Sequence, residues 1–310
     1  MIQKQLPPQL LPVGFYDLLF DEAEKNHENI NLALATFLKA GYRLIKTPLV
    51  EFENNFSTAE TKNSFRTTDI ISGENLIFRN DITPQISRLL STRLKQEKFP
   101  LKLCYAGDVL CAKNEELHAD RQQTQAGIEI IGCDEEKSDF EIISTLLAAL
   151  KKLGHKNLLI EFSAPDFFEI FCDELQIKNK SELRAAVMKK NLSEIKRLAG
   201  KNYEIISKIA LSNDNLKNLT TEISAKIKSK RISDELKKAQ KISEFLQKEF
   251  SESEVRFDLF GDHESSYHHG ISFDVFCGDF SYPIARGGRY KIGDKNAVGA
   301  TIYMNRLRKI

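Results

Sequence analysis

The sequence predicts an α+β fold, in which an antiparallel sheet is flanked by helices and carries an all-helical insertion. Residues 102–131 and 255–285 are rich in β-branched and aromatic side chains, and parts of both stretches alternate between apolar and polar residues. Residues 165–250 lie between them, contain one proline and one glycine, and place apolar residues at helical spacing. A helical block that interrupts a run of strands indicates a sheet with an insertion.

The stretch from Ala106 to Gly132 is predicted to form a β-hairpin with an unusual polar row. One face of its second strand carries, in order, Gln123, Gln125, Gly127 and Glu129. One interpretation is a sheet with one face in water. The other is a binding floor, on which amide and carboxylate groups grip a small polar ligand and the glycine lets that ligand lie close to the backbone.

The composition is that of a globular protein in a reducing compartment. The chain has 310 residues, of which 41% are hydrophobic and 29% charged. Its formal net charge of +1 gives no electrostatic argument for a nucleic-acid surface. The first residues lack the apolar core of a secretory signal, and no apolar run is long enough to span a bilayer. We therefore expect a cytoplasmic protein without a membrane partner.

Neither the cysteines nor the histidine pair predicts a metal site. The five cysteines are scattered, and no two have Cys-x-x-Cys spacing. His268 and His269 are adjacent on a predicted strand, so their side chains point to opposite faces. Because no cysteine or carboxylate stands near them at helical ligand spacing, we expect no metal and no cofactor.

Two further segments combine charged side chains with turn signals. In Arg79–Gln85, Thr83 suits a helix N-cap and Pro84 suits the first helical position, but capping does not explain Arg79 or Asp81. In Arg286–Tyr290, two glycines stand between two arginines. They indicate either a simple bend or a place where the backbone approaches a ligand.

Taken in order, several segments resemble class II aminoacyl-tRNA synthetases in their histidyl form. Each motif is weak alone, and the resemblance rests on their order and spacing. The matching segments are Thr47–Glu51 for the dimer-interface motif, Tyr105–Val109 with Gln125–Glu129 for the second motif, Tyr267–Phe273 for the histidine-specific segment, and Gly287–Tyr290 with Gly299–Leu307 for the approach to the third motif.

The departures from that family concern the activation chemistry. Synthetases carry in the second motif an arginine that holds the ATP α-phosphate, followed two residues on by an acidic residue, and here Cys111 and Lys113 stand at those places. A thiol and an amine cannot replace a bidentate guanidinium on phosphate. No arginine directly precedes Tyr267, and we expect no anticodon-binding domain after the third motif. The resemblance therefore implies a protein that has lost amino-acid activation.

By contrast, the resemblance implies a retained site for histidine. Carboxylates and amide oxygens suit an ammonium group, and an aromatic side chain suits the imidazole. The residues it assigns to this site are Asp81, Thr83, Gln125, Glu129, Tyr267, His268 and Tyr290. Three arginines are candidates for a nucleotide or phosphate: Arg79, Arg121 and Arg306.

A synthetase-like core without activation chemistry resembles the family of regulatory subunits of ATP phosphoribosyltransferase. The segment Arg79–Gln85 is close to that family's Arg-Pro-Asp-x-Thr-Pro-Gln. The resemblance implies a homodimer that joins the short catalytic subunit in a hetero-oligomer, activates it in histidine biosynthesis, and transmits inhibition by histidine as effector. From this resemblance we do not expect tRNA to be a partner. We expect the core at 1–163 and 253–310 and the insertion at 164–252.

Two other functions stay open. The chain could be a synthetase paralogue that activates an amino acid, which Arg306 favours and Cys111 opposes. It could also be an amino-acid sensor for an unrelated partner. The lysines of the insertion are interspersed with glutamates, so a solvated surface explains them more simply than RNA binding.

Overall fold

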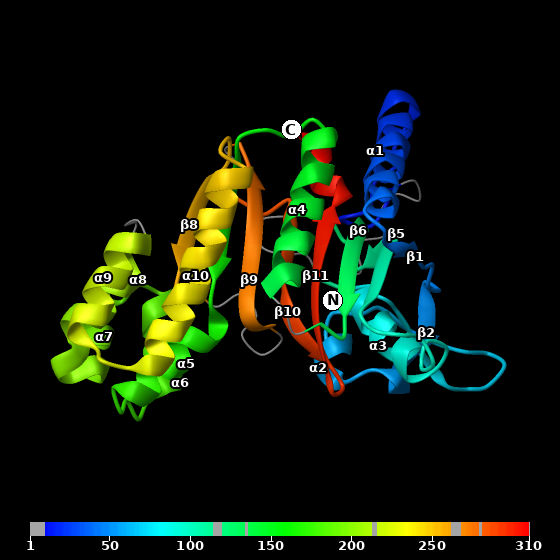
Figure 1. Ribbon diagram of the computed structural model, residues 1–310. Helices are drawn as coiled ribbons and strands as arrows, with labels where there is room; N and C mark the ends of the chain where they lie inside the picture. The colour runs from blue at the N-terminus through cyan, green and yellow to red at the C-terminus, as the bar shows by residue number, and fades with distance from the viewer. Residues whose placement is uncertain are drawn as a thin grey trace. The chain divides into compact units, whose positions relative to one another are not determined.

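The fold is α+β, as predicted, and Figure 1 shows its helices and strands in a computed structural model. The structure describes residues 10–113, 120–133, 136–212, 216–261, 268–278 and 281–309. The chain divides into two compact units. The first consists of 1–98, 103–127 and 302–310, and the second of 99–102 and 128–301.

The first unit contains mostly short elements. Its segments are α1 (Phe20–Lys39), β1 (Arg43–Leu44), β2 (Val50–Phe52), η1 (Glu53–Asn55), α2 (Thr58–Thr61), β3 (Arg66–Thr68), β4 (Asn75–Phe78), α3 (Thr83–Ser91), most of β5 (Leu101–Leu110), the first part of β6 (Gln122–Ile131) and η3 (Met304–Lys309). Strand β6 passes from the first unit into the second between Gly127 and Ile128.

The second unit contains most of the helices. Its segments are the end of β6, α4 (Glu136–Lys152), β7 (Leu158–Ser163), α5 (Pro165–Glu174), α6 (Lys180–Met188), α7 (Leu192–Ala199), η2 (Gly200–Asn202), α8 (Tyr203–Leu211), α9 (Leu216–Lys226), α10 (Lys230–Glu249), β8 (Glu254–Asp258), β9 (His268–Cys277), β10 (Ala285–Ile292) and most of β11 (Lys295–Tyr303).

The strands of the first unit form two groups. Strands β1, β5 and β6 are neighbours, with β1 parallel to β5 so that Arg43 pairs with Leu103. Strands β2, β4 and β3 form a small antiparallel sheet in which Ile77 pairs with both Glu51 and Arg66. Helix α3 begins soon after β4 and so is close in sequence to this small sheet.

The strands of the second unit lie in the order β6-β11-β10-β9-β7-β8. Strands β10 and β7 both run antiparallel to β9, whereas β8 runs parallel to β7, so the predicted antiparallel sheet has a parallel pair at this edge. In Figure 1, helices α4 and α10 lie in front of these strands. Phe140 of α4 stacks on Phe245 of α10 with ring centres 4.4 Å apart, so the two helices pack directly together.

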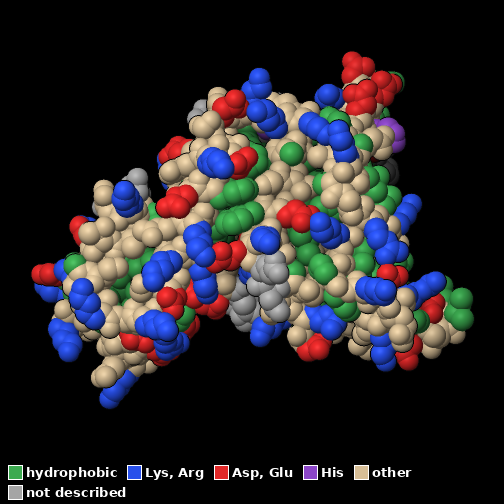
Figure 2. Space-filling model, in the orientation of Figure 1, with side chains coloured by type: hydrophobic (Ala, Val, Ile, Leu, Met, Phe, Trp, Pro, Cys, Tyr) green, Lys and Arg blue, Asp and Glu red, His purple; other side chains and the backbone are tan. Residues whose placement is uncertain are grey.

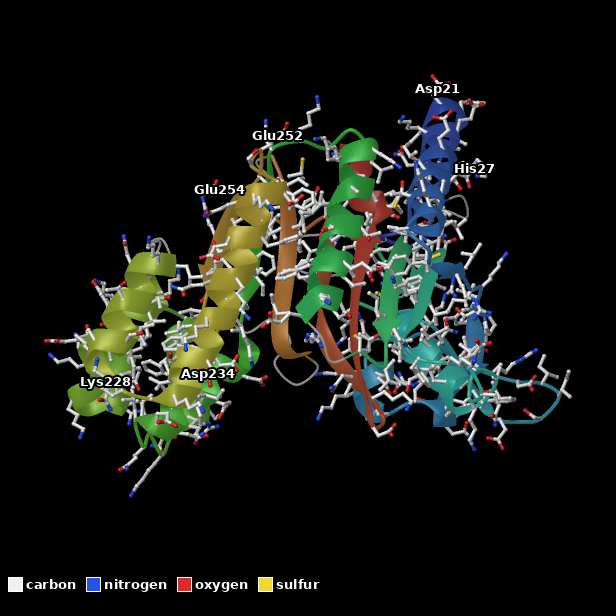
Figure 3. The ribbon with its side chains drawn as sticks, in the orientation of Figure 1. Asp21, His27, Lys228, Asp234, Glu252 and Glu254 are labelled. Atoms are coloured by element: carbon white, nitrogen blue, oxygen red, sulfur yellow. The ribbon has the colours of Figure 1, made fainter. Side chains whose placement is uncertain are left out.

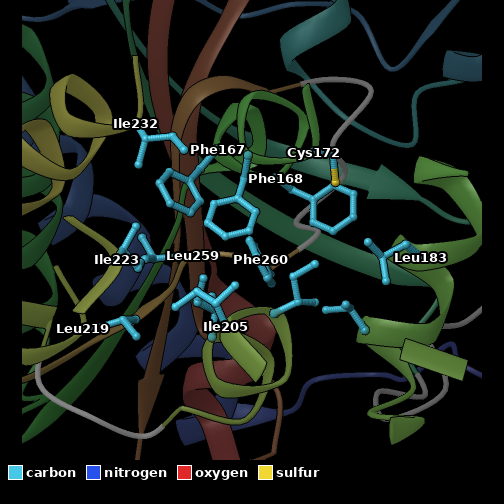
Figure 4. Packing of buried hydrophobic residues seen from close by; sticks show 14 of the residues in the cluster. Phe167, Phe168, Cys172, Leu183, Ile205, Leu219, Ile223, Ile232, Leu259 and Phe260 are labelled. Atoms are coloured by element: carbon cyan, nitrogen blue, oxygen red, sulfur yellow. The ribbon is translucent and has the colours of Figure 1, made fainter. Parts of the chain in front are cut away.

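The predicted helical insertion is helical throughout its described part, from α5 to α10. Its core is an apolar cluster in which Phe167, Phe168 and Phe171 surround Phe260 (Figure 4). Each of these four side chains is at least 99% buried, and burying a phenylalanine stabilises the fold by about 1.5–3 kcal/mol. Phe260 comes from the segment after β8, so the helices of the insertion pack against the strand segment within one compact unit.

The lysines of the helical segment lie on a charged surface with carboxylates among them. Lys208 is 2.5 Å from Glu222, and Lys226 is 3.6 Å from Glu204. In Figure 3, the labelled side chains of Lys228 and Asp234 lie at the edge of these helices. Exposed pairs of this kind contribute about 0–1 kcal/mol each to the free energy of unfolding, so they add little to stability.

Candidate functional site

The polar row of β6 is buried, which contradicts the interpretation of a sheet face in water. Gln123 and Gln125 are each 4% exposed and Glu129 is 2% exposed. Each has a specific partner: Gln123 donates to the Asp120 carbonyl at 3.0 Å, and Gln125 Oε1 accepts the Ile82 N–H at 3.3 Å. Buried polar groups that are satisfied in this way fix the positions of the segments they join.

In the first unit, Gln125 positions the start of helix α3, where Asp81 and Thr83 lie on either side of Ile82. Its bond to the Ile82 N–H holds the start of α3 beside β6. Thr83 is buried and lies at the first position of the helix, and Ile82 is the N-cap, without a side-chain cap. The prediction that Thr83 caps the helix is therefore wrong, and its side chain points instead toward Tyr105, with the two hydroxyl oxygens 3.5 Å apart.

Gly127 is required by a tyrosine of the neighbouring strand. A Cβ atom at this position would overlap the phenol ring and hydroxyl group of Tyr105. Tyr105 is itself 1% exposed, so its ring fills the space above the glycine. The expectation that this glycine makes room for a ligand does not fit the structure, because a side chain of the protein occupies that room.

Arg79 is the centre of a buried hydrogen-bond network. Its guanidinium donates to the Asp108 carbonyl at 2.7 Å, to the hydroxyl of Thr47 at 2.8 Å and to the side chain of Gln85 at 3.2 Å. Burial lowers the pKa of Arg79, and nearby carboxylates oppose that shift. A Cβ on Gly107 would overlap the guanidinium, which explains that glycine. The predicted role as a phosphate ligand does not fit Arg79, because its donors are directed into the protein.

The network continues to the segment that resembles the dimer-interface motif. Gln85 donates to Glu51 at 2.8 Å, and Arg88 donates to both oxygens of Glu51 at 2.6 and 2.8 Å. Bidentate pairs between arginine and carboxylate are among the stronger polar contacts in proteins. No local pattern predicts this pairing, since Glu51 and Arg88 are 37 residues apart in the chain.

The other two candidate arginines are also packed against the protein. The guanidinium of Arg121 lies 4.7 Å from the ring centre of Phe65 and 5.3 Å from that of Phe15. Arg306 is fully buried, with its guanidinium 4.0 Å from the Tyr303 ring. Cation–π contacts hold both groups in place. Arg306 is thus closed off from the surface, whereas Arg121 is half-buried between two aromatic rings.

The position of the missing synthetase arginine lies at the end of β5. Cys111 is half-buried, and its backbone pairs with that of Arg121 through a 2.7 Å hydrogen bond. Lys113 follows, and its backbone N–H donates to Asn63 at 2.7 Å. The hairpin therefore keeps its local backbone pairing while lacking a guanidinium at this position.

In the second unit, Glu129 and Tyr290 form a buried pair. The Tyr290 hydroxyl donates to Glu129 Oε2 at 2.6 Å, and the two residues are 4% and 2% exposed, respectively. A Cβ on Gly299 would overlap the Glu129 carboxylate, so glycine is needed there. A buried carboxylate beside a phenol is suited to an ammonium group, because the negative charge favours a cation.

The remaining predicted site residues give less information. Tyr267 lies outside the described residues. The backbone of His268 belongs to β9 and pairs with Tyr290, which brings the two predicted residues together on neighbouring strands.

In the described part of the chain, no three His, Cys, Asp or Glu side chains are placed to hold a metal ion. The helices described there also include none long and apolar enough to cross a membrane.

The family model described as histidyl-tRNA synthetase matches residues 14–307. The chain belongs to the histidyl-tRNA synthetase family. Its curated relatives carry another name: a protein of Thermoanaerobacter pseudethanolicus is 32% identical over 90% of this chain and 75% of its own length, and is named ATP phosphoribosyltransferase regulatory subunit. A relative from Paramagnetospirillum magneticum with the same name is 28% identical over 96% of this chain and 80% of its own length.

Solved structures agree on the histidyl-tRNA synthetase fold. A Bacillus halodurans structure of an ATP phosphoribosyltransferase regulatory subunit/histidyl-tRNA synthetase aligns with a TM-score of 0.84 at 23% identity, covering 98% of this chain and 84% of the other. A chain of the ATP phosphoribosyltransferase complex of Thermotoga maritima aligns with a TM-score of 0.70 at 18% identity, covering 90% and 97%. The predicted resemblance to the regulatory subunits within this family is thus confirmed.

Proposed function

We propose that this chain is a non-catalytic regulatory subunit of ATP phosphoribosyltransferase in histidine biosynthesis. Its partner would be the short catalytic subunit, which transfers a phosphoribosyl group from phosphoribosyl pyrophosphate to ATP. The observation that carries the proposal is the 32% identity to a curated regulatory subunit over 90% of the chain. The loss of the phosphate-holding arginine at Cys111 supports it, because a regulator does not need that group.

The arginine positions argue against retained amino-acid activation. Loss of one preorganised donor to a developing charge slows a reaction by about 10²–10³-fold. Arg79 is bound to Thr47, Gln85 and Asp108, so it does not offer a substitute for the missing guanidinium. Arg306, which would favour the synthetase alternative, is fully buried.

Histidine would act as the effector through the amino-acid site inherited from the synthetase family. Glu129 would accept the α-ammonium group, and the Tyr290 hydroxyl, already 2.6 Å from that carboxylate, would keep it oriented. The sequence prediction adds Asp81, Thr83 and Gln125, of which Gln125 holds the Ile82 backbone. Regulation then requires that histidine bind two states of the complex differently, by about 1–3 kcal/mol in typical cases.

A homodimer would form through the segment that resembles the dimer-interface motif. Several large apolar side chains near it are exposed in the single chain, namely Leu44 at 52%, Leu49 at 40% and Phe52 at 40%. Exposed apolar side chains that gather in one region are typical of association surfaces. The buried Glu51–Arg88 pair would hold this segment in shape for its partner.

The assembly part of the proposal is tested by mixing the purified chain with a short-form ATP phosphoribosyltransferase from a histidine operon of the same genome. We expect the two to co-elute from a size-exclusion column as one complex. The non-catalytic part is tested by histidine-dependent exchange of pyrophosphate into ATP, which we expect to be absent. Exchange by the chain alone, without a complex, would favour the synthetase alternative.

A further inference from the structure

The second unit contains a cavity whose described lining includes none of the predicted site residues. It has a volume of about 260 Å³ and lies between α4, α10 and the strands β7, β8, β9 and β10. Phe140, Phe162, Phe257 and Ile242 form most of its apolar wall. Figure 2 shows hydrophobic side chains at the surface between these two helices, with charged side chains of both signs around them.

The charged side chains that line the cavity form three ion pairs. Arg289 Nε is 2.7 Å from Asp139, Lys241 is 3.0 Å from Glu136, and Lys238 is 2.6 Å from Glu235. The Arg289–Asp139 pair is the deepest, with side chains 17% and 8% exposed, whereas both lysines are 57% exposed. The cavity therefore combines an aromatic interior with equal numbers of positive and negative groups.

Ser163 gives a second, independent sign of a ligand site. This residue lines the cavity and is 2% exposed. Its hydroxyl oxygen has no hydrogen-bond partner among the residues that the structure describes. A buried hydroxyl without a partner costs about 1–3 kcal/mol, so an occupant of the cavity that bonds to it would recover that loss.

From this lining we propose that the cavity binds a small zwitterion with an aromatic body, of which a free aromatic α-amino acid is the simplest example. The ring would lie against Phe162 and Phe257, which stack with centres 5.3 Å apart. The carboxylate of the ligand would bind Arg289 and its ammonium group Asp139. The volume is just below the range of about 300–1,000 Å³ typical of sites for drug-sized ligands, which suits a ligand as small as an amino acid.

The Arg289–Asp139 ion pair is the reason why we expect a ligand with both a carboxylate and an ammonium group. A ligand with a carboxylate alone would take Arg289 from Asp139 and leave a buried carboxylate without its partner. A ligand with an ammonium group alone would pair with Asp139 and leave the buried Arg289 guanidinium without its partner. Breaking a buried pair on one side is costly, whereas a zwitterion replaces both partners at once.

The first test of this site is calorimetric titration of the full chain with L-phenylalanine, with 3-phenylpropionate and phenethylamine as ligands that each lack one charge. We expect one phenylalanine per chain, with a dissociation constant below about 1 mM, and at least about tenfold weaker binding of the other two. Equal binding of 3-phenylpropionate, or no binding of phenylalanine, would overturn the proposal.

The location is tested with variants of α10 and β10. Ala239→Leu fills the cavity from its wall and should remove phenylalanine binding. Arg289→Gln removes the group that would bind the ligand carboxylate and should weaken binding at least about tenfold, whereas Lys248→Ala, on α10 but outside the described lining, should leave it unchanged. Circular dichroism would verify that each variant is folded. Should Ala239→Leu fail to fold, equal affinities of the Arg289→Gln and Lys248→Ala variants would still overturn the location.

Discussion

The Asp139–Arg289 pair makes a quantitative prediction about the pH dependence of stability. Burial raises the pKa of the Asp139 carboxyl from its usual 3.8 to about 6, although the Arg289 guanidinium opposes the shift. The folded state therefore binds this proton more tightly than the unfolded state does. The contribution of the group to stability is complete below about pH 4, and it is lost as the pH rises to about 6.

The magnitude follows from the size of the shift. A difference of about two pH units at about 1.4 kcal/mol per unit gives about 3 kcal/mol. Because the side chain is only 8% exposed, solvent screening reduces this figure little. The Asp139→Asn variant does not titrate here, so its stability relative to the natural chain should increase by about 3 kcal/mol between pH 4 and pH 7.

The assay is urea unfolding of the natural chain and of Asp139→Asn at several pH values. The quantity compared is the difference between their free energies of unfolding at each pH. All other titratable groups are present in both proteins, so their contributions to the free energy of unfolding cancel in that difference. In Arg289→Gln, which lacks the charge that lowers the pKa of Asp139, the loss of stability should extend to higher pH. A difference that is flat from pH 4 to pH 7, or that falls, would refute the reasoning.

Three further predictions concern the buried network and the proposed histidine site. Arg79→Lys should lower the free energy of unfolding by about 2–4 kcal/mol, because the amine cannot replace the donors to Thr47 and Gln85, as urea unfolding would measure. Gly299→Ala should abolish histidine binding in calorimetry, since its Cβ would displace the Glu129 carboxylate. Tyr290→Phe should weaken histidine binding about tenfold while circular dichroism stays unchanged, and unaltered affinity would contradict its role.

Much of the fold could be predicted because its signals are local in sequence. Residues 102–131 and the helical block 165–250 carry periodicities of two and 3.6 residues, and the structure has strands and helices at those places.

The site was predicted less completely, because burial depends on segments far apart in the chain. The alternation along β6 identified the polar row, but not that Tyr290, 161 residues away, donates to Glu129. The sequence makes Arg79 a candidate phosphate ligand, because its actual partners Thr47 and Asp108 are 32 and 29 residues away and leave no local signal. Similarly, no local pattern joins Asp139 to Arg289, so the cavity beside them had no sequence signal.

The central claim is that this chain regulates a phosphoribosyltransferase, and the most direct measurement is the partner's rate. The initial rate of pyrophosphate release from phosphoribosyl pyrophosphate and ATP would be measured for the short catalytic subunit with and without an equimolar amount of the chain, and then with histidine added. We predict that the chain raises the rate and that histidine lowers the rate of the mixture. An unchanged rate, at concentrations where the two proteins form a complex, would contradict the proposed function.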